Sequence, residues 1–302
     1  MKIRFLFLLI ICQHLKILFA QDSSPCDQSR KICPNQNVKY CHEFLAYDEL
    51  TNLYLLRKDY STPYTGSCVS CYPSFIIEEK LNFKDGKRDG TDTSYYKTGC
   101  IQSIQTYSLG LEQGPTRIYY DSLNIIHFEI GYQEGKYHGA SIRFSTNGDT
   151  LMFKHYKNGI FDGPQRFYFP DGKLRKTCFY QNGLLEGAET TFGHNGQMEC
   201  LLEFKKGKKH GAWSYYFESG KLARRENYKD GKKNGAFITY NELGQIMQTE
   251  SFNMDMPIDL HQTFYNDGKL KYSCRYSNKG AKVEEYFIDE YGVKKQLFPE
   301  KN

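Results

Sequence analysis

Glycine recurs along this chain with a fixed period of 24 residues. Three such series run in register, and self-similarity at one period is the signature of a repeat architecture. In such an array each unit buries its apolar side only against its neighbours, so contact surface is favoured over a deep pocket. The first series is Gly135, Gly159, Gly183, Gly207 and Gly231, the second is Gly139, Gly163, Gly187, Gly211 and Gly235, and the third is Gly148, Gly172, Gly196, Gly220, Gly244, Gly268 and Gly292.

Each unit contains two turn signals separated by strand-like runs. Asn158-Gly159 and Pro170-Asp171-Gly172 are typical turn sequences, because glycine adopts positive φ without steric cost and Asp or Asn hydrogen-bonds its own local backbone. The runs between the turns are rich in Tyr, Phe, Thr and Ile, which favours strands. The sequence therefore predicts an all-β fold, an elongated single-layer antiparallel meander of 24-residue β-hairpin repeats.

Aromatic residues repeat with the same period. Leu174 and Tyr180 have the same parity along one predicted strand, so they face the same side of the sheet, whereas Arg175 and Thr177 face the other. We therefore expect an aromatic ladder on one face and a polar, charged opposite face. The ladder series is Tyr132, Tyr156, Tyr180, Phe204, Tyr228, Phe252 and Tyr276.

The period is interrupted twice. One inserted residue shifts the phase before Tyr132, near Leu123, and Asp255 and Asp259 stand where two glycines are expected. We expect the loop 254–259 to be built differently from its counterparts. The array is predicted to fill residues 45–298 with about nine or ten units, with atypical units at its ends, and residues 299–302 form a tail.

The repeat resembles a known family. Residues 204–216 and 228–237 follow the pattern aromatic-x-Asn/Asp-Gly-Lys-x-x-Gly closely, apart from Lys206 at the Asn/Asp position, and this pattern is similar to that of the variant form of MORN repeats. The resemblance implies an elongated sheet of stacked hairpins and no single activity. Relatives are regarded as membrane-apposition modules, as scaffolds, as additions to enzymes and, in bacteria, as putative antitoxin components.

The first 20 residues have the form of a signal peptide. A basic start is followed by a short apolar run and a small residue, Ala20, at a plausible cleavage site. We expect a secreted protein or one in the secretory lumen, with a signal-anchored protein as the alternative. Cleavage would remove Lys2, Arg4 and Lys16 and reduce the net charge from +5 to about +2, which gives no general attraction to nucleic acid.

Cysteines gather near the start of the predicted mature chain. In an oxidising compartment they favour a disulfide-bonded N-terminal cap over residues 21–44. The Cys68-x-x-Cys71 spacing also fits a metal or redox site, but on a strand the two side chains point to opposite faces. Cys178 and Cys200 are not expected to bridge. The predicted disulfide cysteines are Cys26, Cys33, Cys41, Cys68 and Cys71.

The sequence contains no recognisable catalytic constellation. His138 and His210 precede the second glycine of their units, where Asp162, Glu186 and Asn234 stand elsewhere, so this is an interchangeable polar turn position. We expect no enzyme activity, no cofactor, no metal and no small-molecule substrate.

The predicted function is therefore a binding or scaffolding surface for another protein. Trp213, the only tryptophan, and Tyr215 are the first candidates for contact residues. The alternative is peripheral attachment to anionic membrane lipids through the basic loops of residues 205–233. The candidate lysines are Lys205, Lys206, Lys208, Lys209, Lys229, Lys232 and Lys233.

Overall fold

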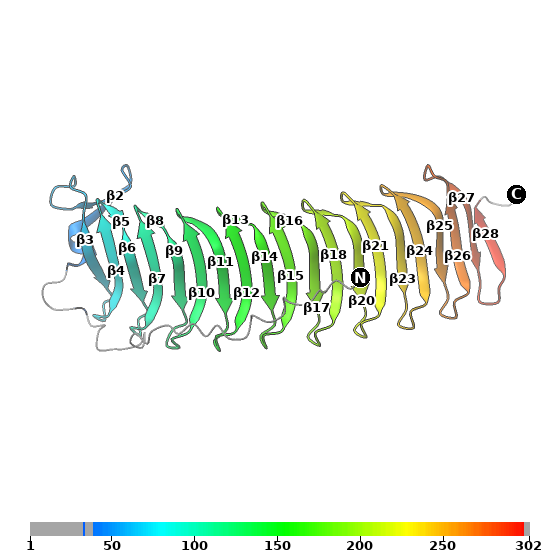
Figure 1. Ribbon diagram of the computed structural model, residues 1–302, viewed down its shortest axis with the longest axis horizontal. Helices are drawn as coiled ribbons and strands as arrows, with labels where there is room; N and C mark the ends of the chain where they lie inside the picture. Colours follow the sequence, from blue (N-terminus) through cyan, green and yellow to red (C-terminus); the bar gives the residue numbers. More distant parts are fainter. Residues whose placement is uncertain (1–32, 34–38, 299–302) are drawn as a thin grey trace, which may run out of the picture.

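Consecutive strands pair into one long, open antiparallel sheet (Figure 1). The structure is a computed structural model that describes residue 33 and residues 39–298. The sheet runs from β3 (Gly66–Cys71) to β28 (Lys294–Phe298), and each long strand pairs with the strands before and after it in sequence. The predicted fold is thus confirmed, whereas the predicted signal peptide, Cys26 and the tail lie outside the described residues.

Long strands alternate with short extensions in most units. The short strands are β5 (Lys87–Arg88), β8 (Leu111–Glu112), β13 (Ile160–Phe161), β16 (Leu184–Leu185), β19 (Lys208–Lys209) and β22 (Lys232–Lys233). The remaining strands of the sheet are β4 (Ile77–Lys84), β6 (Gly90–Tyr95), β7 (Ile101–Ser108), β9 (Gly114–Tyr119), β10 (Ile126–Gln133), β11 (Lys136–Phe144), β12 (Thr150–Lys157), β14 (Gly163–Tyr168), β15 (Leu174–Gln181), β17 (Gly187–Phe192), β18 (Met198–Lys205), β20 (Gly211–Tyr216), β21 (Leu222–Lys229), β23 (Gly235–Tyr240), β24 (Ile246–Asn253), β25 (Met256–Phe264), β26 (Leu270–Tyr276) and β27 (Lys282–Ile288).

The first glycine of each unit closes a tight hairpin and also joins it to the preceding unit. Lys157 and Ile160 are paired, so the loop contains only Asn158 and Gly159, whose φ angles are 51° and 87°. Positive φ at both positions is the requirement of a type I′ turn. The Gly159 N–H then donates to the Tyr137 carbonyl of the unit before, at 2.8 Å. The same inter-unit bond recurs at successive first glycines, including Gly183, Gly207 and Gly231.

The residue before the second glycine supports the next unit's turn. Asp89 accepts from the Leu109 N–H at 3.0 Å, and Glu186 accepts from the Lys206 N–H at 2.7 Å. Side chains of several types can therefore supply the acceptor at this position, although His138 Nδ1 makes no hydrogen bond among the described residues. His210 is one of them, with its Nδ1 3.5 Å from the Asp230 nitrogen.

The first interruption of the period lies in a turn, and so does Asp255 of the second, whereas Asp259 lies within β25 with a φ angle of 60°. The inserted residue lies in the loop between Tyr119 and Ile126, where the Tyr120 N–H donates to the Ile125 carbonyl at 2.9 Å. The expectation of a different loop at residues 254–259 is wrong at its first turn. Met254 and Asp255 adopt φ angles of 52° and 71° and form the same two-residue hairpin. Aspartate is among the non-glycine residues that enter this region most readily.

The sheet begins later than the predicted boundary at residue 45. Residues 45–56 form a separate hairpin of β1 (Leu45–Asp48) and β2 (Leu53–Leu56), preceded by the short helix α1 (Cys41–Phe44). This segment packs on the first strands of the sheet through one apolar cluster. The hairpin buries residues that a single sheet end would leave exposed, so it acts as the cap of the array. The buried members of the cluster are Cys41, Leu45, Tyr64, Cys68, Leu81 and Phe83.

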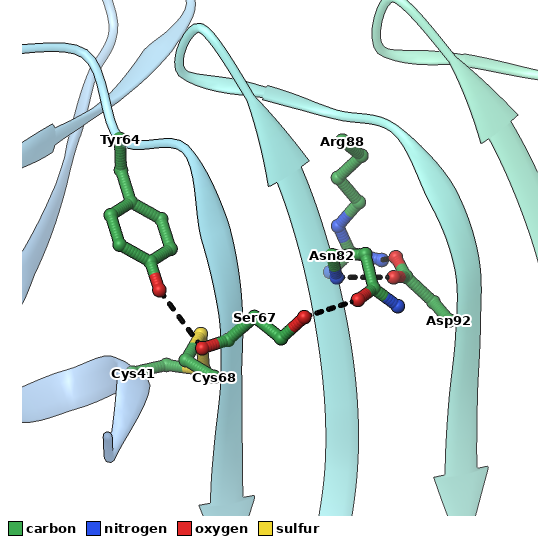
Figure 2. Close-up of a disulfide and its surroundings, with 7 residues drawn as sticks. All are labelled: Cys41, Tyr64, Ser67, Cys68, Asn82, Arg88 and Asp92. Atoms are coloured by element: carbon green, nitrogen blue, oxygen red, sulfur yellow. Dashed lines mark hydrogen bonds and ion pairs between the residues drawn. A yellow bond between two sulfur atoms is a disulfide. The ribbon is translucent and has the colours of Figure 1, made fainter. Parts of the chain in front are cut away.

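Two disulfides fix the cap to the first strand of the sheet. Cys41 bonds to Cys68 (Figure 2), and Cys33 bonds to Cys71. The predicted disulfide role of these four cysteines is confirmed, and each cysteine of the Cys68-x-x-Cys71 motif has its own partner. The Tyr64 hydroxyl donates to the Ser67 carbonyl at 2.8 Å beside the bond in Figure 2.

We predict that the array tolerates loss of a whole unit better than loss of half a unit. Deleting residues 183–206 joins Asn182 to Gly207 and recreates an Asn-Gly turn, so a shorter protein should unfold in one cooperative transition. Deleting only residues 183–194 removes β16 and β17, and we expect it to remove most of a stability of about 5–15 kcal/mol. Circular dichroism and urea unfolding measure both, and equal damage from the two deletions would contradict the repeat model.

Candidate interaction surface

The predicted aromatic series forms a column across the sheet, here called the ring column. Among the described residues a ring bridges every step of it except the one from Tyr180 to Phe204. Its rings do not touch one another directly. Between Tyr132 and Tyr156 lies Tyr137, with ring centroids 5.1 and 5.2 Å away. Between Phe204 and Tyr228 lies Trp213, which comes from a different position of its unit. A ring at such spacing adds roughly 0.5–1.5 kcal/mol per pair beyond the area it buries.

The space between two successive column rings is here called a slot. In each unit, either of two positions can supply the side chain that fills it. One lies two residues after the first glycine and the other lies four residues further on, two after the second glycine. Where the first is large, as in Phe161, the second is polar, as in Gln165, and where the second is aromatic the first is a lysine. The position pairs are Arg88 and Asp92, Glu112 and Thr116, Tyr137 and Ser141, Phe161 and Gln165, Leu185 and Glu189, Lys209 and Trp213, and Lys233 and Phe237.

Side chains at the second of these positions also bond to the backbone ten residues earlier. The Gln165 amide donates to the His155 carbonyl at 3.1 Å, and Trp213 Nε1 donates to the Glu203 carbonyl at 2.8 Å. Asp92 instead accepts from the Asn82 N–H at 2.7 Å. One backbone site thus accommodates a donor or an acceptor, although the second oxygen of Gln165 and of Asp92 makes no hydrogen bond among the described residues.

Trp213 lies inside the ring column and not on an exposed surface. It is 6% exposed, and its ring lies 5.2 Å from Phe204 and 5.1 Å from Tyr228. Its burial and its hydrogen bond explain its place in the fold, but they leave little of the indole free for a partner. Tyr215 is half-buried, and the Arg224 guanidinium lies over its ring at 4.6 Å.

The candidate lysines divide into two groups. Lys209 lies over the Trp213 ring at 4.1 Å, and Lys233 lies over the Phe252 ring at 4.5 Å, so both are cation–π partners of the column. The others are exposed and surround two adjacent hairpin turns, and we call them the lysine turns. They comprise Lys205, Lys206, Lys208, Lys229 and Lys232.

Like charges face each other in the lysine turns. Lys205 is paired directly with Lys208, and Lys229 is paired with Lys232. Cross-strand pairs of the same charge destabilise a sheet. No ion pair within 4.0 Å joins any of these lysines to a carboxylate in the described part of the chain. Their charge is therefore available to a partner.

An exposed apolar row leads into the lysine turns along the same side of the sheet, the upper edge in Figure 1. Its members are Leu109, Leu111, Ile160 and Leu184, which are 64%, 50%, 49% and 49% exposed. The exposed Lys136 stands between Leu111 and Ile160 and divides the row in two. Leu184 lies beside the lysine turns, because a Cβ at Gly207 would be 3.5 Å from its Cδ2. We call this row together with the lysine turns the turn edge.

The expected division into an aromatic face and a charged face is wrong in part. The face that carries the ring column also carries ion pairs, since Glu226 lies directly opposite Trp213 and pairs with Arg224 at 3.0 Å. Glu189, at the position equivalent to Trp213, pairs with Lys176 at 2.8 Å. The period alone did not show this, because the second slot position changes residue type from unit to unit.

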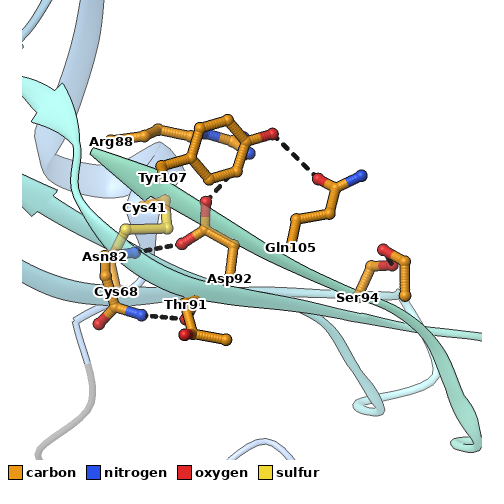
Figure 3. Close-up of polar contacts among 10 residues, drawn as sticks. Cys41, Cys68, Asn82, Arg88, Thr91, Asp92, Ser94, Gln105 and Tyr107 are labelled. Carbon is orange, nitrogen blue, oxygen red and sulfur yellow. Dashed lines mark hydrogen bonds and ion pairs between the residues drawn. A yellow bond between two sulfur atoms is a disulfide. The ribbon is translucent and has the colours of Figure 1, made fainter. Parts of the chain in front are cut away.

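One such ion pair was missed by sequence reasoning. Arg88 and Asp92 occupy the two slot positions of their unit, with Arg88 Nη1 3.1 Å from Asp92 Oδ2 (Figure 3). Arg88 also lies 5.3 Å from the centre of the Tyr107 ring. Burial is the main cause that raises the pKa of Asp92. The sequence did contain a sign of this ion pair, because Asp92 stands at the second slot position, where later units have the aromatic residues Trp213 and Phe237.

The remaining thiols do not form a visible reactive centre. Cys178, Cys200 and Cys274 are free, and burial raises the pKa of Cys178 to about 11, so this thiol stays protonated at neutral pH. Cys100 is disulfide-bonded, although nothing in the sequence had singled it out. Across residues 33 and 39–298 there is no group of three His, Cys, Asp or Glu side chains placed to hold a metal ion. Nor does any helix in that part of the chain have the length and apolar character to span a membrane.

Comparison with known proteins agrees with the repeat geometry. A family model described as MORN repeat variant matches residues 161–182, 209–230 and 260–278. The chain contains MORN repeats. The matched segments begin at or near the slot positions of their units, so the MORN pattern coincides with the hairpins that build the ring column. No curated protein matches the chain.

Similar solved structures belong to much larger chains. One is the TcdB2-TccC3-Cdc42 crystal structure, with 9% identity over 76% of this chain and 15% of that chain and a TM-score of 0.19. Another is the Tc holotoxin pore of Photorhabdus luminescens, with 11% identity over 83% of this chain and 15% of that chain and a TM-score of 0.16. This chain spans about 15% of their length, and TM-scores this low support no argument about fold or function.

We predict that Trp213→Ala destabilises the protein by about 3–5 kcal/mol, because it empties a slot of the ring column and leaves the Glu203 carbonyl without the indole donor. Leu243→Ala is the matched control, since Leu243 is 76% exposed in a turn and should change stability by no more than about 0.5 kcal/mol. Urea unfolding measures both. A loss as small for the tryptophan variant as for the control would show that the column does not support the sheet.

Proposed function

We propose that this chain is a non-catalytic binding protein whose sheet serves as a contact surface for another protein. The supporting observation is the turn edge, where an apolar row exposed by 49–64% runs into lysines that form no ion pair within the described residues. Exposed apolar side chains gathered in one place are typical of interaction sites. Unpaired charge beside them favours a partner with a complementary acidic surface.

The single-layer architecture supports the same proposal. Beyond the N-terminal cap, the described residues place no second layer on the sheet, so its faces and turn edges are open there (Figure 1). Such a surface suits a long contact with another macromolecule more than the enclosure of a small substrate. The MORN repeats imply a repeat-based surface and no particular chemistry.

Secretion is part of the proposal. Two disulfides in the described residues are compatible with an extracellular or secretory environment. The basic and apolar start of the sequence has the features of a cleaved signal. A protein in that compartment would meet its partner outside the cytosol.

The test compares capture by the intact protein with capture by two turn-edge variants. One variant combines Leu111→Ser, Ile160→Ser and Leu184→Ser, and the other combines Lys205→Glu, Lys208→Glu, Lys229→Glu and Lys232→Glu. Quantitative mass spectrometry of proteins retained from the native secretory fraction should show a partner held by the intact chain and reduced at least tenfold by either variant.

The control places three lysine-to-glutamate changes on the opposite edge, as Lys173→Glu, Lys221→Glu and Lys269→Glu, and should retain the partner. Circular dichroism confirms that all variants are folded. A partner retained equally by the turn-edge variants and the control would refute the role of the turn edge, and the absence of any retained protein would refute the proposal of protein binding.

A second candidate function is attachment to an anionic membrane surface through the lysine turns. Their five exposed lysines are grouped on two neighbouring hairpins, and each lysine near an anionic bilayer contributes about 1 kcal/mol. Exposed Leu184 beside them could enter the interface. We predict that sedimentation with phosphatidylcholine vesicles rises as phosphatidylserine is added and disappears in 0.5 M salt, given a Debye length of only a few ångströms at such concentrations. Binding that is independent of lipid charge would exclude this candidate.

A further inference from the structure

A hollow lies at the edge of the sheet opposite the turn edge, the lower edge in Figure 1, between the turn that joins β17 to β18 and the end of β20. Its volume is about 480 Å³, and ligand sites usually measure about 300–1,000 Å³. Gly193, Met198, Tyr216 and Phe217 are half-buried and line it. We call it the Gly193 hollow.

Residue 193 stands at a position that is aromatic in many other units. The Phe169 N–H and the Gly193 N–H each donate to the carbonyl four residues later, at 2.8 Å, so both residues begin the same kind of turn. Gly193 thus keeps the backbone of the turn and omits the ring. The other aromatic residues at this position are Tyr72, Tyr96, Tyr120, Phe217 and Tyr265.

Units that lack a ring elsewhere use a polar side chain to cap the turn from the same position. Asn241 Oδ1 accepts from two N–H groups of its own turn, both at 3.0 Å. The Gly193 turn is instead of the ring-bearing type, because Asn195 caps it from two residues further on, as Asp171 does beside Phe169. The other residues that cap from this position are Ser145 and Asp289.

The backbone does not require glycine at residue 193. Its φ angle lies outside the left-handed region that favours glycine. The nearest neighbours of a Cβ built there would be Asn195 Oδ1 at 3.0 Å and Glu199 Oε1 at 3.1 Å, which are the ends of flexible side chains. The missing side chain therefore leaves space for a ring and meets no need of the turn.

Rings at this position reach into the following unit. The hydroxyls of Tyr72, Tyr96 and Tyr265 donate to the carbonyl 23 residues later, at 2.9, 2.7 and 2.8 Å. The carbonyl that stands in the same relation to residue 193 is that of Tyr216, which lines the hollow. An aromatic ring that carries a hydroxyl donor is therefore the chemical complement of this space.

The remaining lining favours the same group. Glu199 and Glu218 both line the hollow, and His194 Nε2 lies 3.4 Å from Asp171 Oδ2. An anionic ligand would meet the two glutamates, whereas a neutral phenol brings an apolar ring and a donor. Met198 adds a polarizable sulfur, which makes favourable contacts with aromatic rings.

We propose that the Gly193 hollow binds a tyrosine side chain of a partner polypeptide, with its ring between Gly193 and Phe217 and its hydroxyl donating to the Tyr216 carbonyl. A side chain is the expected source of the ring, because the rings at the equivalent positions are themselves side chains of a hairpin. The inference rests on the proposed protein-binding function and adds a recognition site on the edge opposite the turn edge.

The test uses three probes with the same backbone. They are the N-acetyl N-methylamides of tyrosine, phenylalanine and norleucine. In a ¹H–¹⁵N NMR titration of the full protein, the tyrosine probe should produce saturable shifts of the amides of residues 193–199 and 216–218 in the millimolar range. The phenylalanine probe should bind about fivefold more weakly, because it lacks the hydroxyl donor. The norleucine probe, which has no ring, should produce no saturable shift.

A variant that fills the hollow from within the chain assigns the shifts to this site. Gly193→Phe supplies the ring that Phe169 and Phe217 supply in the adjacent units, and it should weaken the tyrosine probe at least tenfold. Leu243→Phe is the matched control, since it adds a ring to another turn of the same edge and should leave the affinity unchanged. Circular dichroism confirms that both variants are folded.

Equal affinities of the intact protein for the tyrosine and norleucine probes would overturn the site, and this comparison needs no variant. A tyrosine affinity that a folded Gly193→Phe protein retains would overturn it as well, as would the absence of saturable binding. Tighter binding of p-cresol than of the tyrosine probe would assign the hollow to a small phenol and overturn the polypeptide as its source. None of these results alters capture by the turn edge, so failure of the site and failure of the protein-binding proposal remain distinguishable.

Discussion

The whole structure depends on lateral packing between neighbouring hairpins. A sheet without a covering layer cannot bury side chains by stacking on a second sheet or on helices, which is how most domains form a core. Here the buried surface runs along the sheet, in the ring column and its slots, and the N–H of each first glycine joins the same neighbours through the backbone. Stability is therefore a sum over adjacent pairs of units, as expected for quasi-one-dimensional proteins.

The ends of such an array need separate solutions. At the N-terminus, α1 and the β1–β2 hairpin cover the first strands, and Cys41–Cys68 and Cys33–Cys71 tie the cap to β3. A disulfide stabilises mainly by restricting the unfolded chain, typically by 2–4 kcal/mol. These bonds therefore strengthen the place where a terminal hairpin would otherwise have only one neighbour.

The fold could be predicted from the sequence because an aromatic residue recurs at one fixed position of the 24-residue period. Every member of the ring series from Tyr132 to Tyr276 occupies the column, since the glycine turns fix the register. The side chain that fills each slot could not be predicted in the same way, because it comes from one of two positions four residues apart, and the position differs between units. Trp213 stands out as an unusual residue in the sequence, but in space it performs the task that Phe161 performs in another unit.

The turns show a second limit of sequence reasoning. The loss of glycine at Asp255 indicated a different loop, yet Met254 and Asp255 adopt the same backbone conformation. The Lys233 N–H donates to Asp255 Oδ1 at 2.7 Å, and the Asp255 N–H donates to the Lys233 carbonyl at 2.9 Å, so the side chain adds a bond that glycine cannot make. Lys209 and Lys233 were predicted as contact residues together with the exposed lysines, but each lies over a ring of the column. The sequence did not show this, because a cation–π contact depends on which side chain fills the slot beside the lysine.

The location of each slot pair within a single unit has a consequence for the history of the chain. Lys209 and Trp213, or Phe161 and Gln165, lie only four residues apart, on either side of one second glycine. A gene duplication that copies 24 residues therefore copies a matched pair, and the new unit arrives with its own filling group for the gap it creates. Such a protein can lengthen by tandem duplication without a second, compensating mutation elsewhere.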